Sequence, residues 1–276
     1  MALFRAVETA KRPDRRLFED PYATPLLSGT LKALAEAARW PLIGGLVPAF
    51  LDLGWPYTRS SGVVRTRMID DLVAEAIRGG AQQLVLFGAG FDSRPYRMRA
   101  AQGIPVFEVD HPATQKVKRE RLGQLPRSVQ FVPIDFEKDD VELALRTAGF
   151  DPEKPALAIW EGVVNYLTEA AVDANFTMLA RLLAPGSRLI LTYVDKRALD
   201  GSVPFQGARR WKSWVRFSGE PFIFGFDPAR LADYLRPQGF VLESDVSTAE
   251  AAKRYCASNE TGSELYRVAA ILRSKT

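Results

Sequence analysis

The sequence has very few of the side chains that build disulfides and zinc sites. Among its 276 residues are one cysteine, Cys256, and one histidine, His111. A single cysteine excludes a disulfide within the chain, and one thiol with one imidazole argues strongly against a zinc site, so we expect no metal. His111 is also the one imidazole available for proton transfer. It lies between Asp110 and a proline, a setting that favours a loop role.

Long apolar runs are lacking too. The longest, residues 41–51, is eleven residues long with two prolines and two glycines, so it cannot span a bilayer. The first residues alternate apolar and charged side chains, unlike a signal peptide. The net charge of +4 comes from scattered basic residues and points only weakly to anionic partners. These features predict a soluble cytoplasmic protein without a membrane partner, and they leave the oligomeric state open.

One basic segment with tryptophans could suggest a nucleic-acid partner. Residues 209–216 read RRWKSWVR, and a helix here would separate Trp211 and Trp214 from the basic side chains. Such interleaving occurs in proteins that bind single strands. Because the segment is short and the net charge modest, we favour a lid helix, inside an insertion at about residues 195–225, and no nucleic-acid partner.

Short apolar runs alternate with helical segments beyond residue 80. This alternation predicts right-handed crossovers and a mostly parallel sheet with helices on both faces, an α/β fold. The last two runs follow a helix near residues 228–235 and could form a closing hairpin at the sheet edge. The expected strands are residues 84–87, 106–109, 130–133, 156–160, 188–194, 240–244 and 266–273.

Residues 1–80 differ from the rest because their pattern is helical. Residues 31–40 are rich in alanine and other good helix formers, and residues 63–77 place an apolar stripe on one helix face. We therefore predict an N-terminal helical lobe or lid at residues 1–80, followed by a core at residues 81–276 that carries the lid insertion.

The first apolar run ends in a glycine turn. Gly88 and Gly90 would let the backbone approach a ligand, and Asp110, twenty residues after Gly90, could accept hydrogen bonds from ribose hydroxyls. A dinucleotide fingerprint would need glycine at position 93, where this chain has Ser93. The pattern favours a ligand with a ribose and no pyrophosphate; the alternative is an ordinary strand-to-helix turn.

Two more acidic residues follow neighbouring strands. Asp135 and Glu161 come after the third and fourth expected strands, at the edge where open parallel sheets bind ligands. Together with Asp110 they suit a ligand that carries positive charge and several hydrogen-bond donors. Capping of the following helix is the alternative role for each of them.

Four motifs, in this order, resemble the leucine carboxyl methyltransferase family. They are GAGFDSR at residues 88–94, FEVDHP at 107–112, EGVVNYL at 161–167 and APGS at 184–187. The resemblance extends from FEDPY at residues 18–22 to RPQGF at 236–240, most of the chain. It implies an S-adenosyl-L-methionine-dependent methyltransferase with the class I, Rossmann-like fold, whose sheet has seven mostly parallel strands.

The resemblance also assigns roles around the nucleoside. Gly88 and Gly90 match the glycines beneath the ribose and methionine parts of the cofactor, and Asp110 matches the acidic residue on the ribose hydroxyls. Asp135 and the backbone of Phe136 match the pair that contacts adenine.

Charged residues match the methionine end of the cofactor. Glu161 matches the acid near the amino group, and Arg65 matches the arginine that pairs with the carboxylate, a task that suits a forked guanidinium. Arg67 could take the place of Arg65. Lys11 or Arg12 could assist from the N-terminal lobe.

The methyl acceptor is not named by any motif. The leucine carboxyl methyltransferases proper tend to have an arginine after the adenine aspartate, where this chain reads FEK at residues 136–138, and it is closer to bacterial relatives, some linked to secondary metabolism. A carboxylate acceptor is ionised at neutral pH and needs no general base, which fits the scarcity of histidine. We therefore expect O-methylation of a small-molecule carboxylate. Tyr166 matches a tyrosine near the substrate end, either positioning substrate or packing in the core.

Three alternatives remain at this point. The acceptor could be a phenol or an enol, the same fold and cofactor could serve a non-methylating reaction such as a cyclisation, or the protein could be a non-catalytic module that senses the cofactor.

Overall fold

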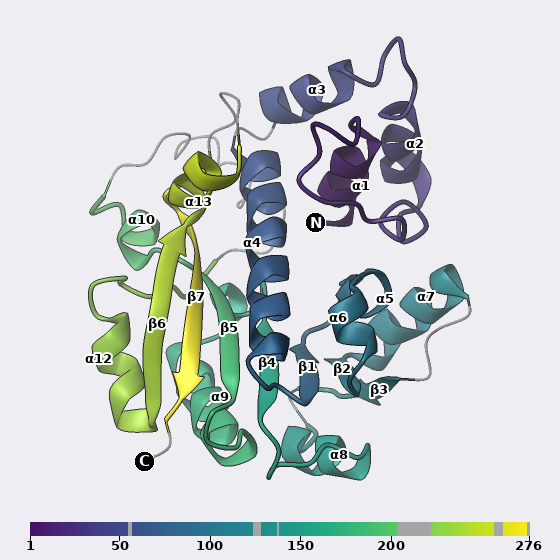
Figure 1. Ribbon diagram of the computed structural model, residues 1–276. Coiled ribbons are helices and arrows are strands. Elements are labelled where there is room, and N and C mark those ends of the chain that lie inside the picture. Colours follow the sequence, from purple (N-terminus) through teal and green to yellow (C-terminus); the bar gives the residue numbers. More distant parts are fainter. Residues whose placement is uncertain (55–56, 124–127, 137, 204–221, 257–261, 275–276) are drawn as a thin grey trace.

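A computed structural model of the chain describes residues 1–54, 57–123, 128–136, 138–203, 222–256 and 262–274. It contains one seven-stranded sheet with the strand order β3-β2-β1-β4-β5-β7-β6 (Figure 1). All seven predicted strands are confirmed: three have the predicted bounds, three begin or end one residue beyond them, and the sixth is three residues longer. Their bounds are β1 Gln83–Phe87, β2 Val106–Asp110, β3 Val129–Pro133, β4 Ala156–Trp160, β5 Arg188–Val194, β6 Phe240–Ser247 and β7 Tyr266–Arg273.

The strand pairing shows the path of the chain through the sheet and the point where the strand order reverses. β1 pairs in parallel with both β2 and β4, so the chain starts in the middle of the sheet, moves outward to β3, and crosses back to β4 and β5. β7 is antiparallel to β5 and to β6, so the predicted pairing of the last two strands at the sheet edge is confirmed, but α13 (Thr248–Tyr255) lies between them in the chain and they do not form a simple hairpin. The point where the order reverses lies between β1 and β4, and open α/β sheets bind ligands there.

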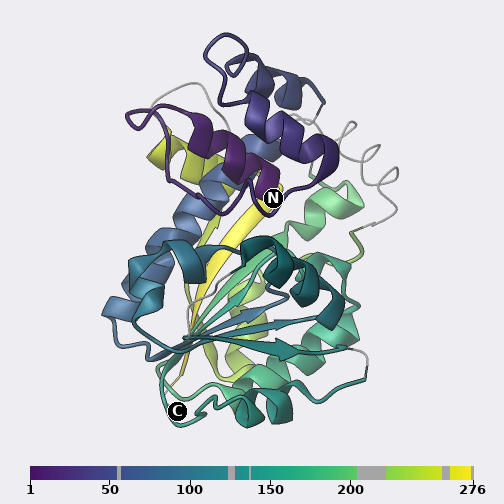
Figure 2. The same ribbon diagram turned by 90° about the vertical axis from the view of Figure 1, so that its right-hand side faces the viewer.

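The helices divide between the sheet, its ends and the N-terminal part (Figures 1 and 2). Helices α4, α5, α6 and α13 bring apolar side chains to one face of the sheet, and α8, α9 and α12 to the other. Their bounds are α1 Ala2–Ala10, α2 Gly29–Ala37, α3 Leu46–Gly54, α4 Thr58–Arg78, α5 Arg94–Arg97, α6 Arg99–Gln102, α7 Pro112–Leu122, α8 Val141–Thr147, α9 Glu169–Leu182, α10 Lys196–Asp200, α12 Leu231–Leu235 and α13 Thr248–Tyr255, with short 3-10 helices at Val164–Tyr166 (η1) and Arg236–Gln238 (η2).

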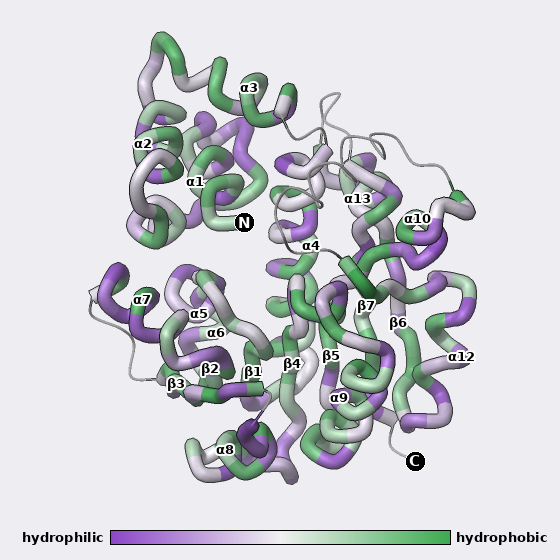
Figure 3. Tube along the Cα trace, turned by 180° about the vertical axis from the view of Figure 1, so that it is seen from behind, coloured by the Kyte–Doolittle hydropathy of each residue, from purple (hydrophilic) through white to green (hydrophobic). Residues whose placement is uncertain are grey.

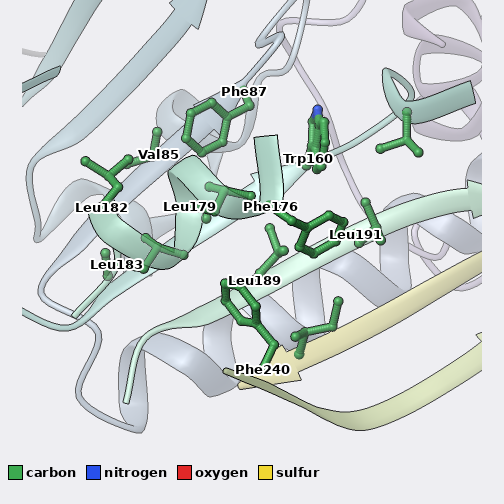
Figure 4. Packing of buried hydrophobic residues seen from close by; sticks show 14 of the residues in the cluster. Val85, Phe87, Trp160, Phe176, Leu179, Leu182, Leu183, Leu189, Leu191 and Phe240 are labelled. Atoms are coloured by element: carbon green, nitrogen blue, oxygen red, sulfur yellow. The ribbon is translucent and has the colours of Figure 1, made fainter. Parts of the chain in front are cut away.

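The alternation of side chains along the strands sets which residues meet which helices. Val85 and Phe87 of β1 face the layer that contains α9, whereas Leu84 and Leu86 face α4. On the first face, Phe176 of α9 lies centrally among strand residues (Figure 4). Every residue of β1 and β4 is buried, as expected for central parallel strands covered on both sides.

The predicted helical region at residues 1–80 contributes in two ways. Helices α1–α3 form their own apolar cluster beyond the end of the sheet, coloured purple to blue in Figure 1. Helix α4 instead packs directly on the sheet through residues such as Ile69 and Val73. A domain boundary at residue 80 stays a prediction, and by its contacts α4 belongs with the sheet.

The outer corner of the N-terminal part is unusually apolar. Trp40, Leu42, Leu46, Phe50 and Leu53 are all more than half exposed, and α3 is coloured as hydrophobic in Figure 3. None of the helices within the described ranges is long and apolar enough to cross a membrane. Most of the predicted lid insertion, residues 204–221, lies outside the described residues.

Candidate active site

The glycine turn after β1 has a backbone that only glycine adopts readily. Gly88 and Gly90 have φ values of +63° and +47°, in the left-handed region. A Cβ atom on Gly88 would also lie 2.6 Å from Cγ2 of Val163. A side chain is therefore disfavoured at both glycines by the backbone conformation, and at Gly88 also by the nearby Val163.

Asp110 joins this turn to the end of β2. One carboxylate oxygen accepts a hydrogen bond from the backbone N–H of Gly90, and the other accepts one from the N–H of His111 at 2.6 Å. The carboxylate is thus fixed beside the glycine turn. His111 is exposed, and its Nδ1 accepts a hydrogen bond from the N–H of Ala113 at the start of α7, which agrees with a loop and capping role.

A cavity of about 290 Å³ lies between the glycine turn and the N-terminal helices. Its walls come from α1, α4, the glycine turn and the loop after β4. Among the lining residues are Arg5, Arg65, Gly88, Gly90 and Glu161. The cavity therefore lies at the reversal point of the strand order, where the fold favours a ligand.

Glu161 has an arginine beside each of its carboxylate oxygens. Nη1 of Arg94 donates a hydrogen bond to Oε2 at 2.8 Å, and Nε of Arg65 lies 3.0 Å from Oε1. Burial by itself would raise the pKa of Glu161, but the positive charges of Arg94 and Arg65 bring this pKa below its ordinary value. Glu161 is therefore an anion at neutral pH.

Arg94 is almost completely buried among acids. Its side chain is 3% exposed, and Nε donates a hydrogen bond to Oδ1 of Asp70 at 2.8 Å. The backbone N–H of Arg94 donates to the carboxylate of Asp92 at 2.8 Å. Burial opposes the charge of Asp92, yet Arg94 and Arg5 lower the pKa of Asp92 to about 2. Burial by itself would lower the pKa of Arg94, but Asp92, Glu161 and Asp70 together raise this pKa above its ordinary value.

The chain of charges continues to the N-terminal helices. Arg97 donates to Asp70 at 2.7 Å, Arg5 donates from Nε to Asp20 at 2.7 Å, and Arg97 lies 3.9 Å from Asp20. Arg5 also donates to the carbonyl oxygen of Phe91 beside the glycine turn. We call the whole set the ionic frame; its members are Arg5, Asp20, Arg65, Asp70, Asp92, Arg94, Arg97 and Glu161.

The geometry separates the two arginines that sequence motifs left interchangeable. Arg65 lines the cavity and meets Glu161. Arg67 points elsewhere: it pairs with Asp71 at 3.1 Å, donates to the carbonyl of Leu17 and lies over the ring of Tyr255. The arrangement favours Arg65 for a role at the cavity.

Lys11 and Arg12 lie outside the cavity lining. Lys11 has its ammonium 2.8 Å from Glu8, and Arg12 is largely exposed beside Asp14. Neither is among the residues that line the cavity.

Three other expected site residues lie outside the cavity lining. Asp135 follows β3, next to the strand that ends in Asp110, and is 2.6 Å from the ammonium of Lys138. Phe136 is about half exposed. Tyr166, in η1, is 41% exposed and packs edge-on against Phe222. The described residues thus bring Arg65, both glycines and Glu161 to one cavity, with Asp110 bound to its glycine wall.

The ionic frame contains residues that sequence reasoning did not single out. Arg94 and Asp20 were present in the motifs GAGFDSR and FEDPY, but no chemistry followed from their spacing. Arg5 and Asp70 had no motif at all. Among the described residues there is also no group of three or more potential metal ligands.

Residues 1–180 match the family model described as leucine carboxyl methyltransferase. A candidate S-adenosyl-L-methionine-dependent methyltransferase of Mycobacterium avium is 31% identical over 246 residues, which cover 87% of this chain and 81% of the relative. Another, from Mycolicibacterium gilvum, is 32% identical over 275 residues, with coverages of 92% and 86%. The similarity therefore spans most of both chains.

Solved structures resemble the chain in fold. A candidate methyltransferase of Thermobifida fusca superimposes with a TM-score of 0.63 at 20% identity, covering 98% of this chain and 97% of its own. An O-methyltransferase family protein of Burkholderia thailandensis gives 0.53 at 15% identity, with coverages of 88% and 72%. The shared architecture is the Rossmann-like sheet described above, with helices on both faces.

Proposed function

Since the chain belongs to the leucine carboxyl methyltransferase family, we propose that it methylates a small-molecule carboxylate. It is an S-adenosyl-L-methionine-dependent methyltransferase of the class I fold. The acceptor, the site residues and a place in secondary metabolism are the parts that we propose. The observation that carries the acceptor class is that the acids at the cavity are held as anions by arginines.

The residues around the cavity fit the parts of this cofactor. A fixed carboxylate at Asp110 suits the ribose hydroxyls, and the bare backbone of Gly88 and Gly90 leaves room for close approach. Arg65 suits the carboxylate of the methionine part, and Glu161 suits its ammonium group.

We place adenine near Asp135 and Phe136. Asp135 is paired with Lys138, whose side chain is 76% exposed. Such an exposed ion pair contributes little free energy, so an adenine amino group could displace it at small cost.

When bound, the cofactor would supply a methyl group on a sulfonium: an acceptor oxygen would attack the methyl carbon in line, and the sulfur would leave as the thioether of S-adenosylhomocysteine. The protein has to align the acceptor and exclude water, and alignment alone can lower a barrier by about 7–11 kcal/mol. The chain's own contribution is therefore mainly positional. Tyr166 is our candidate for positioning the acceptor.

The acids at the cavity are poor proton acceptors. Asp92, with a pKa of about 2, and Glu161, with a lowered pKa, are both paired with arginine. His111 serves as the N-cap of α7. A phenol, with a pKa of about 10, normally needs a base, whereas a carboxylate arrives already ionised. Because neither these acids nor His111 is a ready base, the side chains at the cavity favour a carboxylate acceptor.

Base lability of the product tests the acceptor class. The protein is incubated with methyl-labelled S-adenosyl-L-methionine and matched panels of carboxylic acids and phenols. A methyl ester releases labelled methanol in alkali, whereas a methyl ether retains its label. Alkali-labile product is the expected result, and alkali-stable product would show a phenol or enol acceptor instead.

A matched pair of arginines tests the cofactor site. Arg65→Ala should weaken binding of S-adenosylhomocysteine by roughly tenfold or more, because it removes a charged hydrogen-bond partner of the ligand carboxylate. Arg67→Ala, two residues along the same helix, should leave the affinity unchanged. Calorimetric titration of both variants measures the difference, and equal losses would remove Arg65 from the site.

A further inference from the structure

The two arginines that hold Glu161 differ in how firmly they are held themselves. Arg94 contacts three acids, Asp70, Asp92 and Glu161, and its side chain is 3% exposed. Arg65 contacts Glu161 from the cavity side, and its side chain is 11% exposed. One partner of Glu161 is thus built into the protein interior, and the other is at the cavity.

The contact between Arg65 and Glu161 is also imperfect. Nε of Arg65 is buried and is 3.0 Å from Oε1 of Glu161, yet it makes no aligned hydrogen bond within the described part of the chain. Arg94, by contrast, donates a hydrogen bond to Oε2. An ion pair without alignment is the weaker of the two, so Oε1 is the oxygen more easily given to another donor.

Charge balance constrains what can enter. The ionic frame contains four arginines and four acids. An ammonium or a carboxylate alone, placed against the frame, would leave one buried charge uncompensated, which is costly. An amino-acid group adds one ammonium and one carboxylate, and therefore keeps the frame neutral.

We propose that Arg94 is a positioning residue that fixes Glu161, so that an entering amino-acid group can exchange partners with Arg65. In the exchange, Arg65 leaves Oε1 for the carboxylate of the ligand, and the ammonium group of the ligand takes Oε1. Arg94 stays on Oε2 and on Asp70 throughout. No bond is made or broken, and every charge has a partner before and after. This inference rests on the proposed cofactor site and assigns a role to a residue outside it.

Two ligands that differ only at the amino-acid end separate this role from a structural one. S-adenosylhomocysteine carries the amino-acid group, whereas 5′-methylthioadenosine keeps the nucleoside and sulfur and lacks it. We define the preference as the ratio of their dissociation constants, measured by calorimetry. The wild-type protein should prefer S-adenosylhomocysteine strongly.

Arg94→Lys is the informative variant, because lysine keeps the charge but loses the fork that reaches Glu161 and Asp70 together. The preference should fall by about tenfold or more, while the affinity for 5′-methylthioadenosine stays within about twofold. Arg97→Lys is the matched control: it alters the same network without touching Glu161 and should leave the preference unchanged. Affinity for 5′-methylthioadenosine also reports whether each variant is folded.

Three results would overturn the inference. If Arg94→Lys weakens the binding of both ligands equally, the role of Arg94 is purely structural. If Arg97→Lys loses as much of the preference as Arg94→Lys, Arg94 has no specific role in positioning Glu161. A wild-type protein that binds both ligands equally would remove the exchange while leaving the cofactor site standing. Failure of the wild-type protein to bind either ligand would instead contradict the proposed function itself.

Discussion

Two of the clusters of buried charge in the described part of the chain differ in their access to the cavity. The ionic frame borders the cavity, whereas the second cluster, which we call the sealed cluster, consists of Glu108 of β2, Lys118 of α7 and Tyr96 of α5 and has no member at the cavity. In the sealed cluster, the ammonium of Lys118 is 2.8 Å from Glu108, and the hydroxyl of Tyr96 donates to the same carboxylate at 2.7 Å. Glu108 and Lys118 are at most 1% exposed, and none of the three residues lines the cavity.

The two glutamates show the consequence in their pKa values. Burial raises the pKa of Glu108, and Lys118 with a neutral tyrosine only partly opposes this. The side chain of Glu161 is 17% exposed, so burial opposes its charge less completely, and two guanidinium groups outweigh that burial and lower its pKa. In this protein, a buried acid that stays charged and faces a cavity, as Glu161 does, indicates a candidate site. A buried acid whose partners shield it completely from the cavity, as Glu108 is shielded, is a structural anchor.

The largest expected effect lies in the sealed cluster. Lys118→Met leaves the carboxylate of Glu108 buried without a cation and should lower the free energy of unfolding by about 3–5 kcal/mol. Urea denaturation measures the loss. The double variant Lys118→Met with Glu108→Gln should recover part of it. A loss below about 1 kcal/mol would mean that this cluster is not an anchor.

A smaller effect, of another kind, is expected at the cavity. Asp110→Ala should weaken both S-adenosylhomocysteine and 5′-methylthioadenosine by roughly 10- to 100-fold, because both carry the ribose that we assign to this carboxylate. Thermal unfolding of the free protein should change little. Asp233→Ala removes an exposed aspartate and serves as the control. Unchanged calorimetric affinity in Asp110→Ala would take this residue out of the site.

The smallest effect concerns acid stability and has opposite signs in the two clusters. The pKa of Asp92 is lowered from 3.8 to about 2, so its contribution is present above about pH 4 and is lost as the pH falls toward 2. The loss should be at most about 2 kcal/mol and absent in Asp92→Asn.

For Glu108, whose pKa is raised, the folded state gains relative stability as the pH falls through that pKa. Urea unfolding at several pH values gives both slopes, and parallel profiles for wild type and Asp92→Asn would contradict the assignment.

Local sequence was sufficient to predict the strands and to bring together part of the candidate site. The central strands β1 and β4 are short apolar runs, as expected for parallel strands buried on both faces, whereas β6 continues through polar residues and ends three residues beyond its predicted end. The glycines and Asp110 were recognisable because a turn and the ends of two adjacent strands bring them together at a fixed spacing. Glu161 follows by the same rule from β4, the other neighbour of β1.

The ionic frame could not be predicted in this way. Arg94 meets Asp70 and Glu161, which are 24 and 67 residues away, and the contacts depend on how α4 lies across the sheet. Helix periodicity gives the faces of α4 but not its rotation relative to the glycine turn. For the same reason Arg65 and Arg67 were interchangeable in the sequence and became distinct only through packing.

The hydrogen bond from Arg5 to the carbonyl of Phe91 joins residues 86 positions apart, and that from Ser93 to Asp20 spans 73. Contacts between such distant positions form only after the entropy of closing a long loop has been overcome, so we expect this wall of the cavity to assemble late in folding. The same wall depends on few side chains, while the strands behind it are continuously paired. Partial unfolding should therefore begin here, with the cavity opening while the sheet remains intact.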